Sequence, residues 1–134
     1  MAKVLGVGGV LFKSPNPQRL NEWYSQWLGM DMRSPPGVTF APDAMPKAGF
    51  TVWSVFAEST DYFAPSEKPF LINLVVDDLD GALKQVRAGG AEVVGGVDEY
   101  TYGRFGWFMD PDGNKVELWQ PATTGGESRP PAKR

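Results

Sequence analysis

The chain has 134 residues, 42% of them hydrophobic and 22% charged, which suits one compact domain. A formal net charge of -3 and an isoelectric point near 4.9 argue against binding to a nucleic-acid backbone, and no apolar run reaches the roughly 18 residues that a membrane span needs. The absence of cysteine and histidine excludes disulfides, thiolate nucleophiles and imidazole, the commonest metal ligand. We expect a cytoplasmic protein with no nucleic-acid or membrane partner.

The first part of the chain predicts a strand and then an amphipathic helix. Residues 4–13 are apolar and β-branched, which favours a strand. Asn16 predicts a helix N-cap and Pro17 suits the first helical turn, while Gly29 predicts the end of the helix. The apolar residues between them recur at helical spacing: Leu20, Trp23, Tyr24, Trp27 and Leu28.

The second half repeats this order about 60 residues later. Residues 70–76 predict a strand, Asp77 and Asp78 precede a helix, and Gly89-Gly90 ends it. The expected buried face of this helix consists of Leu79, Ala82, Leu83 and Val86. The repeat therefore indicates two copies of one module.

Strand-like segments follow each helix, which makes the module β-α-β-β-β. They cover residues 38–40 and 49–57 in the first copy, and 91–94, 104–109 and 115–120 in the second. The run Asp110-Pro111-Asp112-Gly113-Asn114 predicts a turn between the last two strands. We expect loops at 42–48 and 58–68, and one domain over 1–121 made of modules at about 4–57 and 69–121, with a disordered tail at 122–134.

Five motifs resemble those of the vicinal-oxygen-chelate superfamily, which includes glyoxalases, bleomycin-resistance proteins and extradiol dioxygenases. They are Trp23-Tyr24, Leu28-Gly29-Met30, the helix start at 76–80, the segment 89–93 and the closing run at 110–118. The resemblance implies an α+β fold in which two βαβββ modules form a cupped mixed β-sheet with the helices outside.

The resemblance also locates the metal ligands of metal-dependent relatives. It places their first-strand ligands at Gly9 and Leu71, which carry no ligating group, and their final-strand glutamate at Glu117. A further counterpart falls within 51–55, where only weak neutral donors occur. Because one carboxylate holds a divalent ion weakly, we expect no metal and no other cofactor.

Strand alternation predicts which side chains face the cup. If Glu117 points inward, Trp119 follows it, and the same argument selects residues on the neighbouring strands. The predicted ligand-binding side chains are Leu11, Leu71, Asn73, Phe105, Trp107, Glu117 and Trp119, with Tyr102 and Arg104 lining the entrance from a loop before the last hairpin.

An aromatic cup with one carboxylate favours the capture of a small organic molecule, aromatic or cationic, by a homodimer. This resembles the metal-free, antibiotic-sequestering members, whose pockets lie between two subunits. Two alternatives stay open. One is a glyoxalase-like lyase or isomerase that uses Glu117 as general base or weak metal ligand, and the other is a structural or regulatory dimer whose cup is filled by Trp107 and Trp119.

Overall fold

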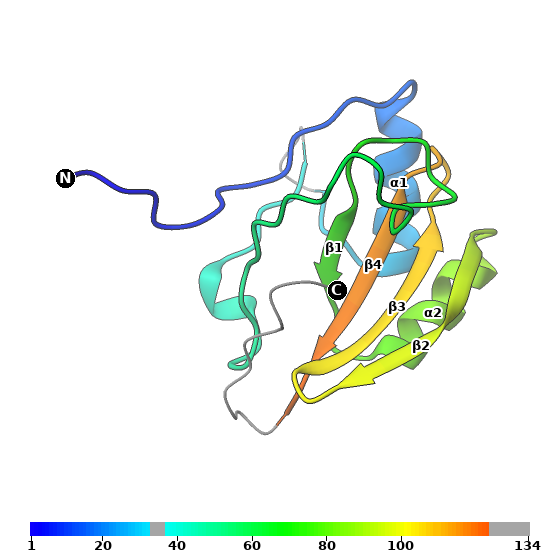
Figure 1. Ribbon diagram of the computed structural model, residues 1–134. Helices are drawn as coiled ribbons and strands as arrows, with labels where there is room; N and C mark the ends of the chain where they lie inside the picture. The colour runs from blue at the N-terminus through cyan, green and yellow to red at the C-terminus, as the bar shows by residue number, and fades with distance from the viewer. Residues whose placement is uncertain (33–36, 124–134) are drawn as a thin grey trace.

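The second half of the chain forms a mixed four-stranded sheet (Figure 1). The computed structural model describes residues 1–32 and 37–123, so most of the predicted tail lies outside the described residues. The elements are α1 (Pro17–Leu28), the short 3-10 helix η1 (Pro42–Ala44), β1 (Ile72–Val75), α2 (Leu79–Ala88), β2 (Glu92–Tyr100), β3 (Gly103–Met109) and β4 (Lys115–Pro121). The strand order is β1-β4-β3-β2, with β1 parallel to β4 and the other pairs antiparallel. This confirms the α+β class.

Both helices begin and end where the sequence predicts. The Asn16 side chain accepts a hydrogen bond from the Arg19 backbone N–H at 3.1 Å, and the Asp78 side chain accepts one from the Gly81 N–H at 3.0 Å. Such caps satisfy N–H groups that have no partner inside the helix. Gly29 ends α1 with a φ of 67°, a left-handed conformation that glycine adopts without steric cost.

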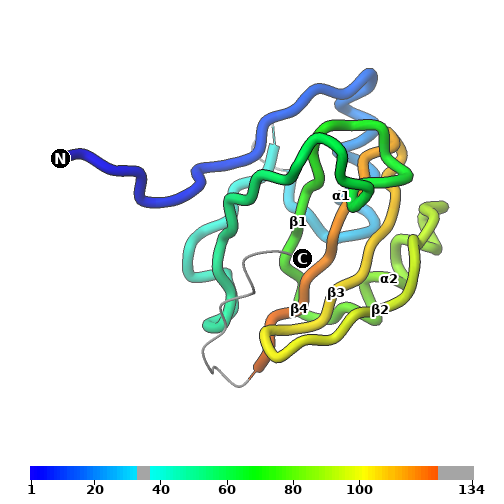
Figure 2. The backbone as a smooth tube through the Cα atoms, viewed as in Figure 1, coloured from blue at the N-terminus to red at the C-terminus, as the bar shows by residue number. Residues whose placement is uncertain are grey.

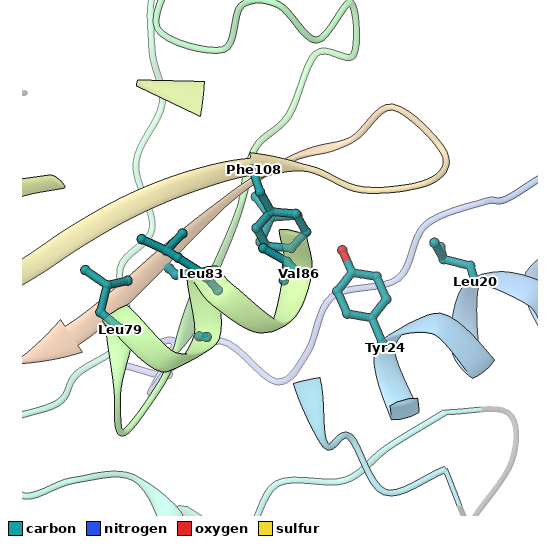
Figure 3. Close-up of a cluster of buried hydrophobic side chains, with 9 residues drawn as sticks. Leu20, Tyr24, Leu79, Leu83, Val86 and Phe108 are labelled. Carbon is teal, nitrogen blue, oxygen red and sulfur yellow. The ribbon is translucent and has the colours of Figure 1, made fainter. Parts of the chain in front are cut away.

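The hydrophobic core lies between the two helices and one face of the sheet (Figure 3). Phe108 of β3 is completely buried and its ring lies 5.7 Å from that of Trp23 and 6.5 Å from that of Tyr24. The predicted apolar face of α2 is buried against the same strands. The buried members are Leu20, Tyr24, Leu79, Ala82, Leu83, Val86, Phe108, Val116 and Leu118.

One buried hydrogen bond ties α1 to the β3–β4 turn. The Tyr24 hydroxyl donates to Asp110 Oδ2 at 2.8 Å, and burial together with the Asp110 charge raises the pKa of Tyr24. Asp110 also accepts from the N–H groups of Asp112 and Asn114 and from the Asn114 side chain. The predicted turn is therefore both confirmed and fastened to the first helix.

Replacing Tyr24 with phenylalanine is expected to lower the free energy of unfolding by about 1.5 kcal/mol, because it removes a hydrogen bond to a charged acceptor. Chemical denaturation measures the change. Tyr100→Phe is the matched control, since Tyr100 is exposed, and it should stay within about 0.5 kcal/mol of the wild type. Equal stability of the two variants would contradict the assignment.

The strands predicted over 4–13, 38–40 and 49–57 are not formed among the described residues. The N-terminal segment instead extends away from the body, as Figure 2 shows, and Trp53 is 82% exposed. A strand exists only where a neighbour supplies its hydrogen bonds, and these segments have no such neighbour within the described chain. The apolar, β-branched composition of these segments was therefore not sufficient to predict strands.

β2 also differs from its prediction. It continues to Tyr100 instead of ending near residue 94, with an irregularity between Val94 and Asp98 where Gly95 has a φ of 70°. Tyr100 and Arg104 thus lie in a hairpin of β2 and β3, and the prediction of a loop before the last hairpin is wrong.

No helix in the described ranges is long and apolar enough to cross a membrane.

Candidate functional site

The sheet face that points away from the helices gathers most of the side chains predicted for the cup. We call it the cup face; it carries Asn73 and Val75 from β1, Phe105 and Trp107 from β3, and Lys115, Glu117 and Trp119 from β4. Glu117 is in register with Asn73 on one side and Trp107 on the other, and directly opposed side chains share a face. Whether these side chains touch a ligand stays a prediction.

The Glu117 carboxylate is the polar centre of the cup face. Its Oε1 accepts a hydrogen bond from Asn73 Nδ2 at 2.6 Å, and its Oε2 accepts one from Trp107 Nε1 at 2.9 Å. The Tyr62 hydroxyl also donates to Oε2. Glu117 is only 2% exposed, and a buried charge is tolerated because converging donors replace its water.

Tyr62 comes from the 58–68 loop and was not predicted as a site residue. Its ring stacks on Phe56, with centroids 5.5 Å apart and planes 11° apart, and meets Trp107 edge-on at 6.4 Å. The loop is fastened by Lys115 Nζ, which donates to the Tyr62 carbonyl oxygen at 2.7 Å, and by Lys68 Nζ, which donates to Asn114 Oδ1 at 2.8 Å. No periodicity in the loop could have revealed this placement.

Lys115 is a second cup-face residue that sequence reasoning missed, although alternation from Glu117 and Trp119 selects it. Its Nζ lies 5.3 Å from the centre of the Tyr62 ring and 6.0 Å from that of Trp107. Burial lowers the pKa of Lys115, while the charges of Glu117 and Asp61 oppose that shift. The cup face therefore holds an ammonium group beside its carboxylate.

This shift predicts a pH dependence of stability. Because the native pKa of Lys115 lies below its unfolded value, the unfolded chain binds more protons between the two values, and stability rises with pH across that window. The wild type should therefore gain stability as the pH rises toward the unfolded pKa of lysine, relative to Lys115→Met, which keeps a long unbranched side chain without the charge. Urea unfolding at several pH values measures the difference, and parallel curves would contradict it.

The other half of the cup face is filled by aromatic side chains. Phe105 and Trp119 stack with centroids 5.8 Å apart and planes 3° apart, and Phe50 covers Trp119 at 4.8 Å. The Trp119 indole donates to the Tyr102 carbonyl at 3.0 Å. Phe105, Trp119 and Tyr102 are all buried, so a ligand reaches this half only if Phe50 or its neighbours move.

Two predicted cup residues do not join the others. Leu11 is 92% exposed because its segment has no neighbouring strand in the described chain. Arg104 lies on the helix side of β3, where it pairs with Asp80 of α2 at 3.1 Å and with Glu99 at 3.2 Å. Its predicted position at the entrance is wrong because Arg104 lies within β3, where alternation turns its side chain away from the face that carries Phe105. Leu71 is half-buried just before β1, and its place on the cup face stays a prediction.

The sequence profile of the glyoxalase-like domain matches residues 9–119. This chain belongs to the glyoxalase-like family. The match covers most of the chain and confirms the vicinal-oxygen-chelate resemblance that the motifs carry. No curated protein matches the chain.

Solved structures share the glyoxalase-like fold at low identity. An integron cassette protein from V. cholerae is 16% identical, with 91% of this chain and 99% of the other covered and a TM-score of 0.56. A protein from the mobile metagenome of V. pseudocholerae is 16% identical over 91% and 98%, with a TM-score of 0.55. TnmS3, an antibiotic-binding protein from a Streptomyces species, is 23% identical over 89% and 100%, with a TM-score of 0.48. The chain spans 46% of the length of a hypothetical protein from S. aureus and of a glyoxalase family protein from Bacillus cereus.

The metal site known from glyoxalase-like relatives does not fit the side chains present. Gly9 and Leu71 offer no ligating atom, and the Glu117 oxygens accept hydrogen bonds from N–H and O–H groups. A divalent ion needs several convergent ligand atoms in place of such donors. Within residues 1–32 and 37–123, no three acidic side chains are grouped so that they could hold a metal.

Proposed function

We propose that this protein is a homodimer that binds a small organic molecule on the cup face without a resident metal. The observation that carries the proposal is the Glu117 carboxylate, which lies 2% exposed among aromatic rings and receives one of its donors from a loop. Small-molecule sites commonly combine an apolar, aromatic lining with a few placed polar groups.

The position of Tyr62 explains how a ligand reaches Glu117. Asn73 and Trp107 donate from the sheet itself, whereas Tyr62 donates from the 58–68 loop. A ligand with its own hydrogen-bond donor can replace the Tyr62 hydroxyl at no net loss of hydrogen bonds, because the buried Glu117 carboxylate keeps the same number of donors. The side chain of Asn73 is exposed and provides an approach.

A compound screen by tryptophan fluorescence tests the proposal, since Trp107 contacts Glu117 directly. We expect saturable quenching by a restricted set of aromatic compounds, lost in Trp107→Phe, together with copurifying small molecules in native mass spectrometry. Product analysis of each hit separates a binding protein from an enzyme. If a diverse collection yields no saturable hit and no copurifying molecule is found, the proposal is wrong.

A filled cup is the second candidate, and the burial of Phe105 and Trp119 favours it. In that case the aromatic side chains act as a core and the protein serves as a structural or regulatory dimer. The same screen separates the two functions, because a permanently filled cup leaves the fluorescence unchanged by every compound.

Exposed apolar side chains in the first half of the chain support the homodimer. Leu11, Trp53 and Val55 are each more than 80% exposed, a large apolar surface for a monomer. The outer edge of β1 is uncharged (Ile72–Val75) and pairs with no other strand of the described chain, and such edges attract a further strand. In a symmetric dimer, a second copy of the chain would cover the exposed apolar side chains and pair with the free edge of β1.

Light scattering after size-exclusion chromatography tests the homodimer. We expect twice the chain mass for the wild type, and one chain mass for Leu11→Lys combined with Trp53→Lys. Glu58→Lys also introduces a lysine, but it reverses a charge at an exposed position outside the apolar surface, and this variant should stay dimeric. A monomeric wild type would refute this part of the proposal without affecting ligand binding.

A further inference from the structure

The Tyr62 side chain sits on the cup face as a phenol would if it were bound there. Its hydroxyl donates to Glu117 Oε2, its flat face stacks on Phe56, and one edge contacts Trp107. The ammonium group of Lys115 lies over the ring at 5.3 Å. The cup face therefore has a hydrogen-bond acceptor, ring contacts and a cation arranged around one hydroxylated aromatic ring.

From this arrangement we propose that the ligands of the cup face are aryl hydroxyls, which compete with Tyr62 for Glu117. The inference rests on the proposed function and specifies its ligand class. An aryl hydroxyl reproduces both the hydrogen bond and the ring contacts that the displaced side chain leaves behind.

Lys115 decides between an aryl hydroxyl and the cationic alternative. A cation that replaced Tyr62 would meet the Lys115 ammonium, which lies against the same ring position, and like charges at such separations repel. A neutral ring instead gains from the cation over its face. An apolar ring without a hydroxyl would leave Glu117 without one of its donors, which a buried carboxylate tolerates poorly.

Competition with Tyr62 makes the loop part of the affinity. Every ligand has to displace the Tyr62 side chain, which is already hydrogen-bonded to Glu117. The apparent affinity therefore equals the intrinsic affinity multiplied by the fraction of protein in which Tyr62 has left Glu117. Removing the Tyr62 ring should therefore strengthen the binding of aryl hydroxyls, in contrast to the usual effect of deleting a site residue.

The experiment titrates phenol and benzene into the wild type and into Tyr62→Ala, which removes a hydroxylated ring of phenol's size. The indole N–H resonance of Trp107 reports binding. We expect phenol to bind Tyr62→Ala at least roughly tenfold more tightly than it binds the wild type, and at least roughly tenfold more tightly than benzene binds the same variant. Adding Glu117→Gln should bring the two probes within a few-fold of each other.

The outcomes separate the ligand class from the function. Equal affinity of Tyr62→Ala for phenol and benzene, or equal phenol affinity of wild type and variant, would overturn the aryl hydroxyl inference and leave ligand binding intact. Failure of both probes to bind folded Tyr62→Ala would count against the binding function itself. If Tyr62→Ala does not fold, Tyr62→Phe keeps the ring and should still bind phenol several-fold more tightly than the wild type; an unchanged affinity would overturn the inference.

Discussion

Replacing Glu117 with glutamine is expected to lower the affinity for ligands that donate a hydrogen bond to this side chain by roughly tenfold to a hundredfold. A hydrogen bond to a charged group contributes about 1.5–3 kcal/mol, and about 1.4 kcal/mol corresponds to a factor of ten in affinity. Glutamine keeps the size of the side chain but loses the charge, and its NH₂ group faces donors instead of accepting from them. Titration calorimetry with any hit from the screen measures the loss.

Glu99→Gln is the matched control, because Glu99 is an exposed carboxylate of β2 that pairs with Arg104 away from the cup face. It should leave every affinity within twofold of the wild type. If Glu117→Gln binds the hits as tightly as the wild type does, the carboxylate is a structural group, and the filled-cup alternative gains.

Replacing Phe108 with alanine is expected to lower the free energy of unfolding by about 3–5 kcal/mol, the usual cost of removing a buried aromatic side chain. Phe108 is fully buried, and its ring contacts Trp23 and Tyr24 of α1 within the cluster that also contains the apolar face of α2. A cavity at this point loosens both helices from the sheet. Denaturant unfolding followed by far-ultraviolet circular dichroism measures the change.

Phe40→Ala provides the comparison, because the same side chain is removed from a position that is 65% exposed. We expect a change of about 0.5 kcal/mol or less. Since Phe108 points to the helices and Glu117 to the opposite face, Phe108→Ala and Glu117→Gln also separate stability from binding. A Phe108→Ala loss as small as that of Phe40→Ala would contradict the core described above.

The sequence by itself determined the local features of this fold. The helix caps at Asn16 and Asp78 and the Asp110–Asn114 turn depend on residues within a few positions of each other, so spacing is sufficient to predict them. The shared face of Trp107, Glu117 and Trp119 depends on alternation along two strands that one short turn joins. Applied consistently, the same alternation also selects Lys115 and turns Arg104 away. Both residues already lay inside the predicted strands 104–109 and 115–120, so both errors came from not applying the alternation to the first residue of each strand.

Only the tertiary structure decided how the cup face is occupied. Tyr62 is 55 residues from Glu117 and lies in a loop without periodicity, so its contact depends on how the chain returns to the sheet. The predictions of strands over 4–13 and 49–57 were wrong for a related reason. A strand needs a neighbouring strand, and sequence composition does not say whether the same chain supplies one. The missing histidine was visible from composition; the loop tyrosine that occupies Glu117 was not.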